Sequence, residues 1–433
     1  MTNMPLSLDQ APPYAVPLRF FFTAPLFGAA AALLLFWYGP AALATRWTPA
    51  VLAITHFMTL GFAVMVMSGA LLQLLPVLVG AHVARPRAVS AVVHGLLSLG
   101  VLMLGMAFLS GRHSLYVVAV LLLVGALAVL LTVTGVALRR RVATQPTARV
   151  ITHALLALLV TLLLGAYLAL LRAGVLMTGT HSLTAAHLTW GLLGWVGLLV
   201  MAVAYQVVPM FQMTPEYPAP ITRWLSRVVL LLLVLWSVLA CGVDGPNRRV
   251  VLTGLAGLLG LSYAVFALST LWLQQRRRRR LPDVTLWFWR LGMVLLLVSI
   301  GIWLIGGFIP QWAEQTAYPV LLGVLMIAGF TVAVISGMLY KIVPFLGWLH
   351  LHASLHSRAE RRTRLPNMKD FIPERAARRQ FYVYLLALCL LTGAALRPVW
   401  FTYPAALTWL LSCGLLWLNI FNAVRLYRRL SQG

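Results

Sequence analysis

Twelve apolar runs, each about 20 residues long, constrain this chain more than any other feature. A run of that length spans the hydrocarbon core of a bilayer as one helix. The runs occupy most of the 433 residues, of which 61% are hydrophobic and 9% charged, so no separate soluble domain is expected. We therefore predict an all-α polytopic membrane protein, a single integral membrane domain over 1–433, with spans at about 18–40, 50–79, 88–110, 115–138, 150–172, 183–212, 224–243, 249–273, 286–309, 318–348, 380–396 and 400–424.

The positive charges predict how the chain is oriented in the membrane. With a cytoplasmic N-terminus, nearly all of the 33 Lys and Arg fall on the cytoplasmic side, including the basic loop 349–379. This follows the positive-inside rule, places both termini in the cytoplasm and indicates a bacterial inner membrane. The net charge of +25 is then a topology signal and a contact for anionic lipid or a partner subunit, not a nucleic-acid site. The basic residues predicted outside are Arg46, Arg112, Arg172, Arg248, Arg249 and Arg397.

One motif occurs three times, in the second, sixth and tenth spans. Its copies read LGFAVMVMSGALLQLLPVL, LGWVGLLVMAVAYQVVPMF and AGFTVAVISGMLYKIVPFL, and their prolines Pro76, Pro209 and Pro344 are 133 and 135 residues apart. A period of four spans predicts internal repeats at approximately 18–138, 150–273 and 286–424. We expect three arcs of four helices about a pseudo-threefold axis, with a pore between neighbouring arcs.

Four of the ten histidines lie at membrane depth, where ionisable residues are rare and functional. His56 and His187 lie near the outer face, 20 and 22 residues before the motif prolines of their spans. Two residues turn a helix by about 200°, so relative to the repeat these histidines point to opposite faces. Opposite faces of two neighbouring central helices border the same pore. We therefore predict that His56 and His187 are the axial ligands of a heme b.

His94 and His153 lie near the inner face, in the third and fifth spans. Both spans border the same predicted pore, so the two histidines could hold a second heme or another metal. One or two hemes are therefore expected, and two would make an electron path across the bilayer. The alternative is that each is an interfacial histidine bonded to a neighbouring polar group. Copper is a less favoured cofactor.

The chain has twelve spans, three repeats of four spans each, and histidines at membrane depth. In these features it resembles subunit I of the heme-copper oxidase superfamily and the NnrS-type heme membrane proteins. The resemblance implies that His56 corresponds to a low-spin heme ligand. It implies a copper ligand at His187 with a tyrosine four residues later, but Gly191 stands there. The family's histidine pair on the seventh span has no counterpart between Thr222 and Val243, and the tenth span has no H-x-H. The binuclear oxygen-reducing centre is therefore not expected.

Other polar and sulfur-bearing side chains are weaker candidates. The spacing of His350, His352 and His356 could bind zinc or copper, although an interfacial amphipathic helix also accounts for it. Gln73, Gln206 and Lys341 occupy equivalent positions near the inner ends of the central spans. They could line a quinone headgroup site, or they could bond the backbone and reach the interface. Methionines that could act as sixth heme ligands, or simply pack, are Met58, Met65, Met67 and Met326.

Three functions are consistent with these features. The first is electron transfer within or across the membrane, possibly from quinol to a periplasmic cytochrome or another redox partner. The second is binding or reduction of nitric oxide or another small gas at a heme. The third is a transporter or channel without a cofactor, although all eight acidic residues lie in tails, loops or span ends, which disfavours proton coupling.

Overall fold

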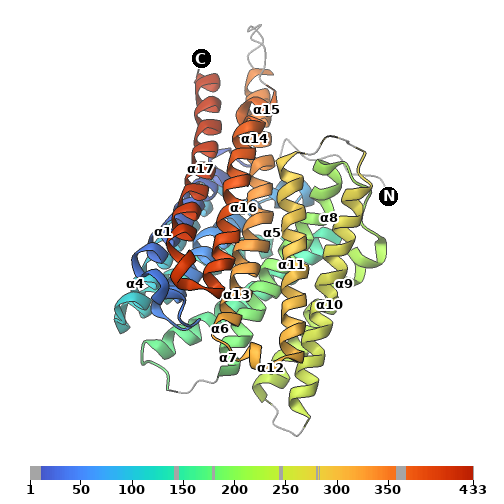
Figure 1. The fold of residues 1–433 in the computed structure, drawn as a ribbon. Coiled ribbons are helices and arrows are strands. Elements are labelled where there is room, and N and C mark those ends of the chain that lie inside the picture. Colours follow the sequence, from blue (N-terminus) through green and yellow to red (C-terminus); the bar gives the residue numbers. More distant parts are fainter. Residues whose placement is uncertain are drawn as a thin grey trace.

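The computed structural model describes residues 11–140, 146–177, 181–242, 247–278, 281, 283–356 and 367–432, and these ranges form helices and no β-strand. The helices lie side by side in one elongated bundle (Figure 1). Their bounds are α1 Ala15–Tyr38, η2 Gly39–Leu43, α2 Pro49–His56, η3 Phe57–Val64, α3 Met65–Val79, α4 Pro86–Ser110, α5 His113–Arg139, α6 Pro146–Arg172, α7 His181–Thr189, η4 Trp190–Gly197, α8 Leu198–Gln212, α9 Ala219–Gly242, α10 Arg248–Gln275, α11 Val284–Phe308, α12 Pro310–Ala313, α13 Ala317–Gly323, η5 Val324–Thr331, α14 Val332–His356, α15 Met368–Phe371, α16 Glu374–Leu396 and α17 Pro398–Gln432.

Twelve continuous helices in the described ranges are long and apolar enough to cross a membrane. The prediction of an all-α chain with twelve spans is therefore confirmed. Short-range signals set several helix ends. Thr48 accepts a hydrogen bond from the Val51 backbone N–H and Pro49 follows it, which begins α2. Gly111, at φ 68°, turns the chain sharply between α4 and α5, in a conformation that favours glycine.

Each copy of the repeated motif contains a π-helical segment of eight residues: η3, η4 and η5. The segments end 12, 12 and 13 residues before Pro76, Pro209 and Pro344, so they lie at matching positions in the motif. A π-helix is rare and often marks a functional region. Tyrosine hydroxyls from other helices donate hydrogen bonds to backbone carbonyls of two of these segments. Tyr263 donates to the carbonyl of Leu193 in η4, and Tyr384 donates to that of Ala328 in η5.

The motif glycines allow close helix packing in all three copies. A Cβ at Gly61 would lie 2.5 Å from Phe27, one at Gly194 2.9 Å from Ala157, and one at Gly329 3.1 Å from Leu295. The contacted residues lie on α1, α6 and α11, the first helix of each predicted repeat. Small residues at such positions let membrane helices approach closely. Each copy of the motif therefore packs on the helix that precedes it.

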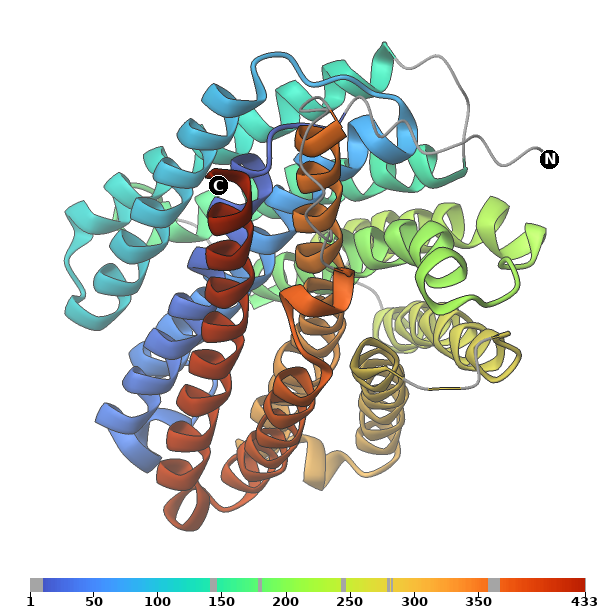
Figure 2. The ribbon, with the colours of Figure 1, turned by 90° about the horizontal axis from the view of Figure 1, so that it is seen from above.

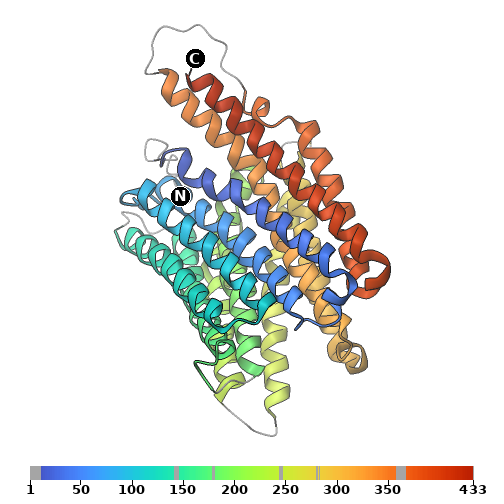
Figure 3. The same ribbon diagram turned by 90° about the vertical axis from the view of Figure 1, so that its left-hand side faces the viewer.

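The first and last long helices are neighbours. α1 packs along α17, and the start of α1 lies at the same end of the bundle as the end of α17 (Figures 2 and 3). The protein is therefore a multi-pass bundle in which both ends of the described chain lie on one side. That this side is cytoplasmic, and that the repeats surround a threefold axis, stay predictions.

Candidate functional site

His56 is the last residue of α2 and directly precedes the π-helical η3. Its Nδ1 lies 2.7 Å from the carbonyl oxygen of Leu52, one turn earlier in the same helix. A carbonyl only accepts, so Nδ1 carries the proton and donates. Nε2 then keeps its lone pair, and it has no hydrogen-bond partner among the described residues. This is the form in which histidine binds a metal.

His187 lies on α7, near the lower end of the bundle in Figure 1. Its Nδ1 lies 3.1 Å from the carbonyl oxygen of Thr161 on α6, so Nδ1 again donates and Nε2 is left unprotonated. Gly165, one turn further along α6, makes room for the ring, because a Cβ there would lie 2.8 Å from Cε1 of His187. The backbone of α6 therefore forms the seat of His187.

The two rings face one another across the boundary of the first and second predicted repeats. Their centres are 6.5 Å apart and their planes differ by 17°. A metal–imidazole bond is about 2.0 Å and a ring nitrogen lies about 1.2 Å from its ring centre, so two imidazoles on opposite sides of one metal ion have centres about 6.4 Å apart. The observed spacing therefore matches ligation of a single metal ion from two sides.

An aromatic side chain packs beside the pair. Phe108 of α4 packs against the ring of His56, with ring centres 5.0 Å apart. Both histidines lie deep in the protein and yet keep some accessible surface.

The two histidines are a sufficient donor set for a heme. No group of three or more His, Cys, Asp or Glu able to hold a metal occurs in the part of the chain that the structure describes. A zinc or copper site needs three or four protein ligands. A heme brings four equatorial nitrogens of its own, so the two free Nε2 atoms are a sufficient protein contribution. The residues present therefore fit a heme with two axial histidines.

The structure does not bring His94 and His153 together. Nε2 of His94 lies 2.8 Å from Oγ of Thr23 on α1, and that hydroxyl donates to the carbonyl of Arg19. Nδ1 of His153 lies 3.2 Å from Oγ of Ser226 on α9. Each histidine thus has a hydroxyl partner within its own predicted repeat. Binding of a second heme or metal by these two residues stays a prediction.

The two inner histidines are related by the repeat. Thr23 lies four residues before Phe27, which packs on Gly61, and His153 lies four residues before Ala157, which packs on Gly194. Thr23 and His153 therefore hold equivalent positions on the first helix. In both repeats a histidine–hydroxyl bond joins the first helix to the third, with the partners exchanged. This symmetry favours a role in helix packing.

The three polar residues near the inner ends of the central spans have different environments. Lys341 forms an ion pair with Asp283, with Nζ and Oδ2 3.3 Å apart. Gln73 is 3% exposed, and its Oε1 has no hydrogen-bond partner among the described residues. Gln206 is half-buried. A quinone headgroup site formed by these three residues stays a prediction.

The histidines after the tenth span make backbone contacts. Nδ1 and Nε2 of His350 lie 2.9 Å and 3.0 Å from the carbonyl oxygens of Leu346 and Pro12. Nδ1 of His352 lies 3.0 Å from the carbonyl of Trp348. The side chain of His356 lies outside the described residues. The methionines proposed as alternative heme ligands pack in or against the hydrophobic core: Met58, Met65, Met67 and Met326.

Sequence reasoning missed Thr161, Gly165 and Phe108, the residues that position the pair. Thr161 contributes its backbone carbonyl, and Gly165 leaves room for the ring because it has no side chain. Neither property is visible in a hydropathy pattern. Fold and site together define a multi-pass membrane protein with a buried pair of ligand-ready histidines. No family model matches the chain, and no curated protein matches its sequence.

Proposed function

We propose that this chain is a heme b-binding membrane protein that mediates electron transfer, with His56 and His187 as the axial ligands. One observation carries the proposal. The ring centres of His56 and His187 lie 6.5 Å apart, each Nδ1 donates to a backbone carbonyl, and each Nε2 is left free to bind a metal. The resemblance to heme-copper oxidase subunit I supports the proposal at the level of architecture. Because the seventh and tenth spans lack the histidines that complete the copper centre, copper-dependent oxygen reduction is not part of the proposal.

The site supports electron transfer better than catalysis. A bound heme would supply one-electron chemistry. Two histidine ligands would fill both of its axial positions, so a gas could bind only if one ligand left. The carbonyls of Leu52 and Thr161 orient the two rings. Rings held in this way need little rearrangement when the charge of the site changes.

The position of the pair suggests the direction of transfer. Both histidines lie toward the end of the bundle that is opposite the start of α1. The distribution of basic residues predicts that this end is periplasmic. Exchange with a periplasmic cytochrome or another redox partner would occur on that side. Quinol dissolved in the bilayer is the proposed donor, and a bacterial inner membrane is the proposed location.

The test is a heme count on the purified chain, expressed with ample heme supply. A reduced-minus-oxidised absorption spectrum with a pyridine hemochrome assay should give b-type bands and one heme per chain. Carbon monoxide added to the reduced protein should leave the bands unchanged, because both axial positions are filled. A shifted spectrum would favour the gas-binding function. Absence of heme would contradict the proposal and favour a cofactor-free transporter.

A further inference from the structure

Arg290 is an exposed arginine on a membrane-spanning helix. It lies six residues after Val284, the first residue of α11, so it is about 9 Å along the helix axis. Its Nη2 donates to the carbonyl of Gln274, at 3.4 Å, in the last turn of α10. No carboxylate of the described residues lies within ion-pair distance of its guanidinium. A guanidinium at this depth can extend to the interface, where an anionic headgroup can pair with it.

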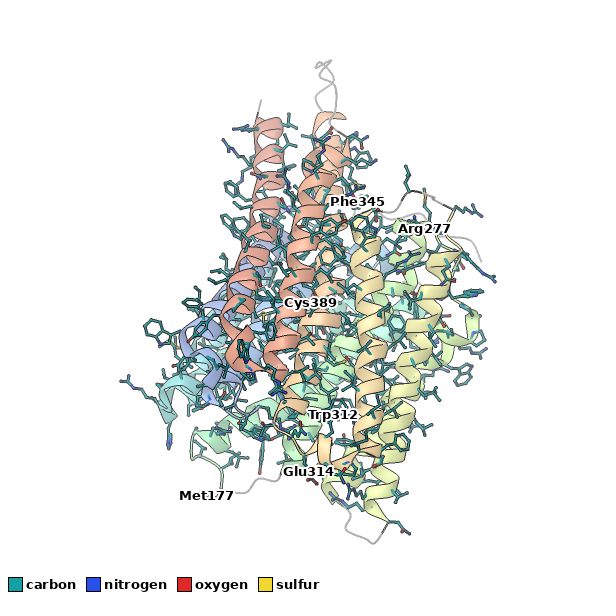
Figure 4. All side chains as sticks on the ribbon, in the orientation of Figure 1. Met177, Arg277, Trp312, Glu314, Phe345 and Cys389 are labelled. Atoms are coloured by element: carbon teal, nitrogen blue, oxygen red, sulfur yellow. The ribbon has the colours of Figure 1, made fainter. Side chains whose placement is uncertain are left out.

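A second guanidinium lies at the same end of α10. Cζ of Arg276 is 3.9 Å from the ring centre of Trp272, and the Trp272 side chain is 43% exposed. Tryptophan with a flanking arginine is typical of the headgroup level of a bilayer. Figure 4 labels the next residue, Arg277, at the upper end of the bundle, remote from the histidine pair.

The residues one turn deeper are apolar and exposed. Leu268 precedes Trp272 by four residues and is 56% exposed, and Val294 follows Arg290 by four residues and is 45% exposed. Basic groups therefore lie above an apolar surface that faces sideways from the bundle. This arrangement matches a lipid, with a charged headgroup above its acyl chains, and not a free anion.

We propose that Arg276, Arg290 and Trp272 bind the phosphate headgroup of an anionic phospholipid from the cytoplasmic leaflet. α10 and α11 pack together and belong to the second and third predicted repeats (Figure 1). The lipid therefore lies on the boundary between two repeats and links them. A chain with 33 basic and eight acidic residues has the charge to select such a lipid.

The test is a titration of the detergent-solubilised, full-length protein with phosphatidylglycerol or phosphatidylcholine, followed by native mass spectrometry. We expect the first phosphatidylglycerol to bind more tightly than phosphatidylcholine. Arg276→Gln and Arg290→Gln should each weaken it roughly fivefold. Arg425→Gln, which removes an exposed arginine of α17, should leave its affinity unchanged.

Three results would overturn the proposal. The first is equal affinity for both lipids, the second is an equal loss in all three variants, and the third is full displacement by millimolar inorganic phosphate, which would indicate a site for free anions. Arg276 is exposed at a helix end, so its variant should fold even if that of Arg290 does not. Heme content should be unchanged in every variant, which keeps this test independent of the heme proposal.

Discussion

His56 and His187 come from spans 131 residues apart in the sequence, and their imidazole rings lie 6.5 Å apart with planes 17° from parallel. This distance matches the spacing of two imidazole ligands on opposite sides of one metal ion. Each ring is fixed by a backbone carbonyl on its Nδ1 side. The proposed function depends on this arrangement of the two rings.

Replacing either histidine of the pair should remove the heme. His56→Ala and His187→Ala each delete one of two axial ligands, so we expect at least a tenfold loss of bound heme b in either variant. His113→Ala is the matched control, because His113 is an exposed histidine at the start of α5. Heme per chain, measured by pyridine hemochrome, checks the prediction. Full retention of heme in both variants of the pair would refute it.

Gly165→Ala should disturb the site with little effect on stability. The new Cβ would lie 2.8 Å from Cε1 of His187, and the ring can swing away from it at small energetic cost. His187 would then lose its bond to Thr161. We expect heme content to fall severalfold while the thermal unfolding midpoint changes little. Gly254→Ala, at a helical glycine with nothing within 4 Å of the added Cβ, should keep its heme.

Two of the motif glycines, Gly61 and Gly329, should differ in their tolerance of alanine. At Gly61 the added Cβ meets Cγ of Phe27 at 2.5 Å and Cβ of Phe27 at 2.7 Å. The Cβ of Phe27 cannot move without the backbone, so we expect a loss of about 1–3 kcal/mol. At Gly329 it meets Cδ1 of Leu295 at 3.1 Å, a side-chain end that can turn aside. Unfolding measurements should therefore show a larger loss for Gly61→Ala than for Gly329→Ala. Equal losses in the two variants would contradict the tighter packing at Gly61.

His94 and Thr23 should behave as a packing pair. A double-mutant cycle with His94→Ala and Thr23→Ala should give a coupling free energy of about 0.5–1.5 kcal/mol, the range of one hydrogen bond. Heme content should stay at one per chain in all members of the cycle. A fall from two hemes to one in His94→Ala would instead support the second-heme prediction.

Removing the carboxylate of Asp283 should destabilise the protein through Lys341. Asp283→Asn keeps an acceptor for the Leu286 N–H at the start of α11 but leaves a largely buried ammonium without its carboxylate. We expect a loss of about 2 kcal/mol, since partial exposure reduces the cost. Lys341→Gln in the same chain should recover most of it, because Gln73 and Gln206 occupy this position in the other repeats. No recovery would show that the ammonium is not the cause.

Features with a long sequence period could be predicted. Apolar runs of span length gave all twelve helices, because length and hydropathy alone decide membrane insertion. The threefold motif predicted matching structure in three places, and the π-helical segments lie in matching register. The register argument also predicted that His56 and His187 would face one another, and the structure brings their rings together. Heme ligation itself stays a proposal.

Features that depend on contacts between helices could not be predicted. The π-helical conformation of η3, η4 and η5 has no hydropathy signature, because these segments are as apolar as the α-helical turns beside them. The sequence could pair His94 with His153 by their depth and by the predicted pore that both spans border. In the structure, hydroxyl partners on α1 and α9 hold them. The carbonyl of Thr161 is a backbone group that any residue at this position would have. Its hydrogen bond to His187 therefore could not be predicted without the three-dimensional structure.

The most direct test of the paired histidines is an electron paramagnetic resonance spectrum of the oxidised, heme-loaded protein. Two axial imidazoles make ferric heme low-spin, and planes only 17° from parallel should give a rhombic signal. We therefore predict a rhombic low-spin spectrum that disappears in His56→Ala and in His187→Ala. A high-spin axial signal in the unmodified protein, or no heme signal at all, would contradict ligation by His56 and His187.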